Sequence, residues 1–272
     1  MSGPRCPRVR LALALVGLTS GWPGVVRADV IDEHVHQGNL AARRGDWTAA
    51  AQAYGEAERL LPGRSAVVSY NLGTAYAQAD RLGLATYHLR RALQTEAQAA
   101  DAVAEAATRN LGIVRRRAEM AAASEQRQIS PPDGVGAVTR ALFGSAWVAT
   151  IAVVGGWACG LLLAARAWSR RRGHDTGRLT AGAVVVAGLT AALAAGHAWS
   201  SRIDAATPLA IVVEDAAEAR GAAGGRGPVS FVVQGGSQVR IVGQTPGWKQ
   251  VRLAGGLVGW VPERSVRRFG TS

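Results

Sequence analysis

Two long apolar runs, residues 142–165 and 179–198, constrain this 272-residue chain more than any other feature. Neither run contains Asp, Glu, Lys or Arg. About 20 apolar residues in a helix cross the roughly 30 Å hydrocarbon layer of a bilayer, and each run is long enough. We therefore predict transmembrane helices at 142–165 and 179–200, and a multidomain membrane protein in place of a single soluble core.

The arginines around these runs indicate how the predicted hairpin is oriented. The connection at 166–178 contains five arginines, whereas the outer flanks offer only Arg140 and Arg202. Cytoplasmic loops are enriched in Lys and Arg, so this connection is predicted to be cytoplasmic. Gly156 and Gly160 have a spacing that lets helices approach closely, and we expect it to serve the packing of the hairpin itself.

Residues 1–28 have the layout of a signal peptide. Arginines precede an apolar run at 11–18, and small or modest side chains precede a cleavage position before Asp29. The alternative is an uncleaved anchor, because Arg27 stands beside the proposed cut. Either reading exports the residues that follow.

The composition argues against several classes of function. Nucleic-acid binding is not expected, because the +12 charge is spread along the whole chain instead of forming one patch. The only cysteines, Cys6 and Cys159, cannot build a disulfide framework, and His34 and His36 have no third ligand at metal spacing. No nucleophile and base are paired, so we expect no enzyme, no metal and no cofactor.

Residues 31–64 and 66–99 repeat one pattern at a spacing close to 34 residues. Gly38 and Gly73 take equivalent places where a partner helix would approach, and each second helix carries small and large residues at helical spacing. These units resemble tetratricopeptide repeats, which implies an α-helical tetratricopeptide solenoid over 29–123. Asn110 begins a partial third unit, which we interpret as a capping helix at 95–123.

Two repeats and a cap fall below the three repeats that usually give independent stability, so we expect a partner or self-association to complete the array. The inner face of the first helices is the expected partner-binding groove. Its candidate residues are Asn39, Arg43, Tyr70, Thr74 and Gln78. The alternative for Asn39 is an ordinary structural role within the repeat. Residues 124–141 lack periodicity and are predicted to be a linker.

After the second apolar run, residues 205–272 change to short β-rich segments separated by glycine-containing turns. Gly247-Trp248 and Gly259-Trp260-Val261, at their spacing, resemble bacterial SH3-like domains, which implies a small all-β SH3-like barrel. Phe231, Trp248 and Trp260 are the candidates for its ligand groove. The alternative places Trp260 and Val251 in the barrel core, with Trp248 as a lid. Residues 214–227 are predicted to be a loop.

The order of these parts resembles the tetratricopeptide-repeat membrane protein of the bacterial Bat aerotolerance operon. The resemblance implies a two-pass inner-membrane protein with both soluble domains in the periplasm. It also implies a scaffold that associates with membrane proteins bearing von Willebrand factor A domains and with a MoxR-type AAA+ ATPase system. The alternative function is a membrane anchor whose SH3-like domain binds cell-wall peptidoglycan.

Overall fold

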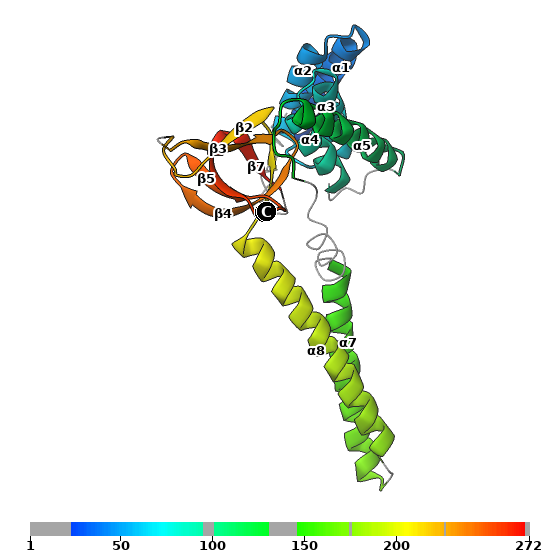
Figure 1. The fold of residues 1–272 in the computed structure, drawn as a ribbon. Helices are drawn as coiled ribbons and strands as arrows, with labels where there is room; N and C mark the ends of the chain where they lie inside the picture. The colour runs from blue at the N-terminus through cyan, green and yellow to red at the C-terminus, as the bar shows by residue number, and fades with distance from the viewer. Residues whose placement is uncertain (1–22, 95–100, 131–145, 174–175, 226, 270–272) are drawn as a thin grey trace, which may run out of the picture.

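The computed structural model describes residues 23–94, 101–130, 146–173, 176–225 and 227–269. They form a helical module, a long helical hairpin and a β-module (Figure 1). The helices of the helical module are α1 (Pro23–Arg43), α2 (Trp47–Leu60), α3 (Ala66–Gln78), α4 (Leu82–Gln94) and α5 (Asp101–Ser124). The predicted signal peptide lies mostly outside the described residues, and its last part, residues 23–28, belongs to α1.

The helical module is built from packed neighbours: α1 on α2, α3 on α4, and α5 on α4. Close approach within each pair depends on glycine. A Cβ at Gly38 would lie 2.5 Å from the ring of Tyr54, and one at Gly73 would lie 2.8 Å from the backbone nitrogen of Leu89. Neither position accepts a side chain without displacing its neighbour. The two hairpins agree with the helical repeat that the sequence predicts.

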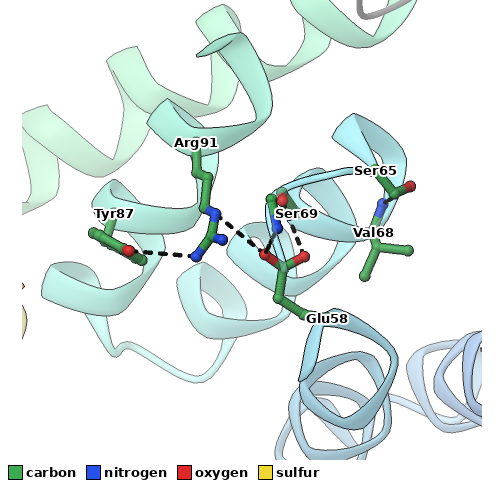
Figure 2. A network of polar contacts seen from close by, with 7 residues as sticks. Glu58, Ser65, Val68, Ser69, Tyr87 and Arg91 are labelled. Atoms are coloured by element: carbon green, nitrogen blue, oxygen red, sulfur yellow. Dashed lines mark hydrogen bonds and ion pairs between the residues drawn. The ribbon is translucent and has the colours of Figure 1, made fainter. Parts of the chain in front are cut away.

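A buried carboxylate joins the first hairpin to the second. Glu58 of α2 is only 7% exposed, and Arg91 of α4 lies 3.2 Å from its carboxylate. The hydroxyl of Ser69 on α3 donates to the same carboxylate at 3.1 Å, as does the backbone N–H of Gly63 at 3.0 Å. Figure 2 shows Arg91 and Ser69 converging on Glu58. A buried carboxylate needs such partners, so the network fixes the two hairpins relative to each other.

The long hairpin consists of α7 (Ala146–Arg171) and α8 (Gly177–Ala206), which pack along each other (Figure 1). Their apolar stretches have mean hydropathies of 2.1 and 1.6, so both helices are long and apolar enough to cross a membrane. The helices extend beyond the predicted spans, because α7 includes the arginines up to Arg171 and α8 continues to Ala206.

The contact between α7 and α8 uses a different glycine from the ones predicted. A Cβ at Gly155 would lie 2.3 Å from the hydroxyl oxygen of Thr190, so the helices touch there. Positions Gly156 and Gly160 have no atom of another element within 4 Å of an added Cβ. The expectation that Gly156 and Gly160 pack the hairpin is therefore wrong, since the pair turns away from α8.

The β-module is a seven-stranded antiparallel sheet in the order β3-β2-β6-β5-β4-β1-β7. Its strands are β1 (Leu209–Val212), β2 (Ala216–Arg220), β3 (Val229–Gln234), β4 (Gln238–Thr245), β5 (Trp248–Arg252), β6 (Val258–Pro262) and β7 (Val266–Arg268). All seven strands contribute to one buried core, which requires the sheet to curl strongly on itself. The 3₁₀ turn η1 (Glu263–Ser265) connects β6 to β7.

Strand β2 corrects the prediction of a loop over residues 214–227. Ala217 and Ala219 are buried in the core, while Glu218 between them is exposed. This alternation is that of a half-buried strand, although alanine has low β propensity. Residues 214–215 lie between β1 and β2, and the part of the segment after Arg220 lies between β2 and β3.

The β-module packs directly on α4 of the helical module. Tyr87 meets Phe269 edge to face, with ring centroids 6.3 Å apart, beside the buried Leu209 and Ile211. A Cβ at Gly83 would lie 2.6 Å from the carbonyl oxygen of Val213 and 2.7 Å from that of Val212, so α4 and the end of β1 are in close backbone contact. We call this contact the seam, and the two modules together the head.

Residues 127–130 strengthen the seam from within the predicted linker. The backbone N–H of Gln128 donates to Val232 at 2.8 Å, and Gln128 accepts from the N–H of Gln234 at 2.9 Å. The Ser130 hydroxyl accepts from the N–H of Ala254 at 3.0 Å. This part of 124–141 therefore extends the sheet beside β3, and residues 131–141 lie outside the described residues.

Candidate functional site

The first group of predicted groove residues lies on α1. The side-chain oxygen of Asn39 accepts a hydrogen bond of 2.7 Å from the hydroxyl of Tyr54 on α2. Burial raises the pKa of Tyr54, while the charge of Arg43 acts in the opposite direction, so the hydroxyl keeps its proton and remains a donor. Asn39 thus stabilises its own hairpin, and Arg43 is the exposed candidate on this helix.

The second group lies on α3 and faces α5. Asn110 donates from Nδ2 to the Thr74 hydroxyl at 3.1 Å and to the Tyr70 hydroxyl at 3.4 Å. Gln78, near the end of α3, is exposed. The structure therefore unites Tyr70 and Thr74 with Asn110, a residue that was not among the candidates. Its signal is in the sequence, because Asn110-Leu111-Gly112 repeats Asn71-Leu72-Gly73.

A buried histidine lies beside this face, at the seam. His88 of α4 is 4% exposed and stacks on Tyr76, with ring centroids 5.6 Å apart. Burial, together with the positive charges of Arg267 and Arg91, lowers the pKa of His88 to about 3. The imidazole is therefore neutral at physiological pH, and its Nδ1 has no hydrogen-bond partner within the described residues.

The aromatic candidates of the β-module occupy different environments. Phe231 packs against the buried core. Trp260 does not: along β6 the buried residues are Gly259 and Val261, and Trp260 points to the opposite face, half-buried. The alternative that placed Trp260 in the core is therefore wrong, although Val251 is fully buried as that alternative required.

Trp248 lines an open groove of about 750 Å³ on the outer side of the β-module. The groove combines one aromatic wall and a proline with charged side chains of both signs. Its lining residues are Glu218, Arg220, Gly225, Gly247, Trp248, Pro262, Glu263 and Arg264. Such a groove can accept an extended peptide through ring contact and ion pairing.

A second cavity, of about 530 Å³, lies at the seam between α4, α5, residues 129–130 and the start of β4. It was not predicted, because its walls come from segments more than 100 residues apart. Among the residues that the structure describes, no three His, Cys, Asp or Glu side chains gather as a metal site would require. The groove at Trp248 and the seam cavity are the candidate binding sites, and Arg43 and Gln78 are the exposed residues of the predicted repeat groove.

A search of protein-family models gives no match to this chain, and no curated protein matches its sequence.

Proposed function

We propose that the chain is a non-enzymatic scaffold of the bacterial envelope that displays binding surfaces at the inner membrane. In this proposal the helical module is a tetratricopeptide solenoid and the β-module is an SH3-like barrel. Its proposed partners are membrane proteins with von Willebrand factor A domains, together with a MoxR-type AAA+ ATPase system, in a complex that serves aerotolerance. The resemblance in the order of parts supplies these partners.

The observation that carries the proposal is the seam. The described residues of 23–130 and 207–269 pack as one head, so both parts must lie on the same side of any membrane that the chain crosses. The two apolar helices lie between them in the sequence, and two crossings return the chain to its starting side. The arginine-rich connection supports a cytoplasmic turn, and hence a periplasmic head.

The fixed positions of the exposed surfaces on the head also support a scaffolding function. The seam and the Glu58 network fix the two hairpins and the β-module relative to one another. Because the surfaces around Arg43 and Gln78 and around Trp248 are already positioned, a partner would spend little conformational entropy in ordering them. A rigid head beside the membrane suits a protein that organises others.

The test is a crosslinking pull-down from membranes with the full chain. Arg43→Ala with Gln78→Ala removes two exposed groove side chains and leaves the bonded residues Asn39, Tyr70 and Thr74 intact. The matched control is Arg59→Ala with Gln52→Ala, a pair on α2 that is also exposed. We expect von Willebrand-domain proteins to be lost only from the first variant. Equal recovery from both would remove the repeat groove from the proposal.

The groove at Trp248 favours peptidoglycan binding as the second candidate function. Its aromatic wall and paired charges suit the short peptides of the cell wall. Full-length chain in detergent would be mixed with purified wall sacculi and sedimented. Cosedimentation that Trp248→Ala abolishes would establish this function, and an absence of wild-type cosedimentation would reject it.

A further inference from the structure

We propose that the seam opens in acid, when His88 takes up a proton and α4 separates from the β-module. Opening uncovers the side of α4 around Tyr87, together with Leu209 and Ile211 of β1. The inference goes beyond the scaffold function. It depends neither on the identity of a protein partner nor on where the membrane lies.

A continuous row of aromatic rings joins His88 to the seam. The imidazole stacks on Tyr76 of α3 at 5.6 Å and meets Tyr87 edge to face at 5.0 Å, both measured between ring centroids. Tyr87 in turn meets Phe269 of the β-module at 6.3 Å. The row runs from the helical module into the β-module, so a change of charge on His88 acts directly beside the contact between them.

The charges that act on the buried imidazole are both positive. Arg91 lies on the same helix, and Arg267 of β7 lies over the Tyr87 ring, 5.5 Å from its centroid. The carboxylate of Glu58 pairs with Arg91, and within the described residues no acid forms an ion pair with His88. Nδ1 also has no acceptor among these residues. A proton on the closed head would therefore create a buried charge beside two like charges.

Opening the seam relieves the protonated imidazole in two ways. Separation of β7 removes the positive charge of Arg267, and water reaches the side of α4 that the β-module covers. Tyr76 belongs to the helical module and stays stacked on His88, where an aromatic face favours a cation. The open head therefore binds the proton more tightly than the closed head, and acid shifts the equilibrium toward the open one.

The seam is weaker than the cores on either side of it. Its apolar cluster is small and consists of Tyr87, Leu209, Ile211 and Phe269. The ion pair that crosses it, Arg81 with Asp215 at 3.2 Å, is half-exposed on both sides, and such pairs contribute little. By contrast, all seven strands contribute to the β-module core. Residues 128–130 bond to β3 and Ala254 and can keep the modules tethered during opening.

The difference between the two states of His88 sets the size of the effect. Its pKa is about 3 in the closed head, and the ordinary value is 6.5. If opening restores the ordinary value, only the open head takes up the proton between these two values. Lowering the pH from 7.5 to 4.5 then raises the ratio of open to closed heads by up to about 100-fold.

The test measures opening through a thiol placed inside the seam. Ile211→Cys puts a buried thiol on β1 of the full chain, in which Cys6→Ser and Cys159→Ser remove the native thiols. The detergent-solubilised protein reacts with dithiodipyridine, and the rate is divided by that of the exposed Gln52→Cys at the same pH. We expect the normalised rate to rise at least tenfold from pH 7.5 to pH 4.5.

Matched variants assign the rise to His88. His88→Leu should reduce it to less than twofold, whereas His36→Leu, at an exposed histidine, should retain it. Arg267→Gln, at an exposed position, should make the rise smaller, because opening then relieves one charge fewer. Asp215→Asn removes the acid that pairs with Arg81 and should retain the rise.

Thiols inside the two modules distinguish opening of the seam from unfolding. Leu72→Cys lies in the core of the helical module and Val251→Cys in the core of the β-module, and both should stay slow at pH 4.5. A rise at these core thiols equal to that at Ile211→Cys would overturn the proposal. So would a rate at Ile211→Cys that does not change with pH, or a rise that neither His88→Leu nor Arg267→Gln reduces.

Discussion

The head and the hairpin use similar apolar residues in opposite places. In the head, Leu72 and Leu89 are at most 2% exposed, and arginines such as Arg59 occupy the surface. In the hairpin, Trp157 and Leu161 are 75% and 71% exposed, while the contact between the helices uses small residues. The difference fits two solvents: water around the head, and the hydrocarbon of a bilayer that both hairpin helices are long and apolar enough to cross.

A charge on each surface would test this comparison most directly, and the largest effect is expected in the hairpin. Leu161→Arg should make membrane insertion of α7 less favourable by about 3 kcal/mol, because the side chain would face lipid. Ile113→Arg, on the exposed surface of α5, should change the head's stability by less than about 0.5 kcal/mol. Insertion is measured by protease protection of the loop. Equal free-energy costs of Leu161→Arg and Ile113→Arg would mean that the hairpin does not face lipid.

Acid should weaken the head through His88. The folded pKa of about 3 lies below the ordinary value of 6.5, so only the unfolded chain takes up this proton as the pH falls through that window. The neutral, buried His88 therefore makes its full contribution to the free energy of unfolding above pH 6.5. Between pH 6.5 and about 3, that free energy falls by about 1.4 kcal/mol per pH unit. Urea unfolding of the detergent-solubilised chain at pH 7.5 and 4.5 should show a smaller pH effect in His88→Leu. An identical pH effect in both chains would contradict this account.

The Glu58 network should be the main polar contribution to stability inside the helical module. Glu58→Ala leaves Arg91 and the buried Ser69 without the carboxylate that they contact, and should cost about 2 kcal/mol. Glu56→Ala, an exposed acid on the same helix, is the control and should cost less than about 1 kcal/mol. Thermal unfolding measures both. Matching losses would show that the network does not join the hairpins.

The smallest expected effect tests whether the close backbone contact at the seam holds the two modules together. Gly83→Ala would place a Cβ 2.6 Å from the Val213 carbonyl oxygen, a backbone atom, and should cost about 1 to 2 kcal/mol. Gly55→Ala has open space and should be neutral or slightly stabilising. Trypsin sensitivity near Arg127 would report seam opening. A protected Arg127 in Gly83→Ala would mean that the two modules stay joined without this contact.

Local patterns predicted much of the helical module and the hairpin. The 34-residue spacing located α1 to α4, because the glycines and alanines that permit close helix packing repeat with it. Hydropathy located α7 and α8. It did not show which face packs: Gly155, not Gly156 or Gly160, meets the partner helix, and this depends on the rotation of the two helices.

The remaining features depend on contacts between distant segments. Alanine alone gives no strand signal. Ala217 and Ala219 form part of β2 because residues of other strands, Phe231 and Gly259, pack around Ala219. Neither the bond from Gln128 to β3 nor the seam cavity has a local pattern. The Asn110 contact could be inferred in part, since Asn110-Leu111-Gly112 repeats Asn71-Leu72-Gly73.

The seam also sets an order in time for making the protein. Tyr87 and Phe269 touch, yet they are 182 positions apart along the chain. At about 5–20 residues per second, roughly 9–36 s pass between their synthesis. During this interval the nascent helical module has an uncovered apolar face on α4, and both hairpin helices are synthesised before that face can be covered. The head can be completed only after Phe269 has been synthesised.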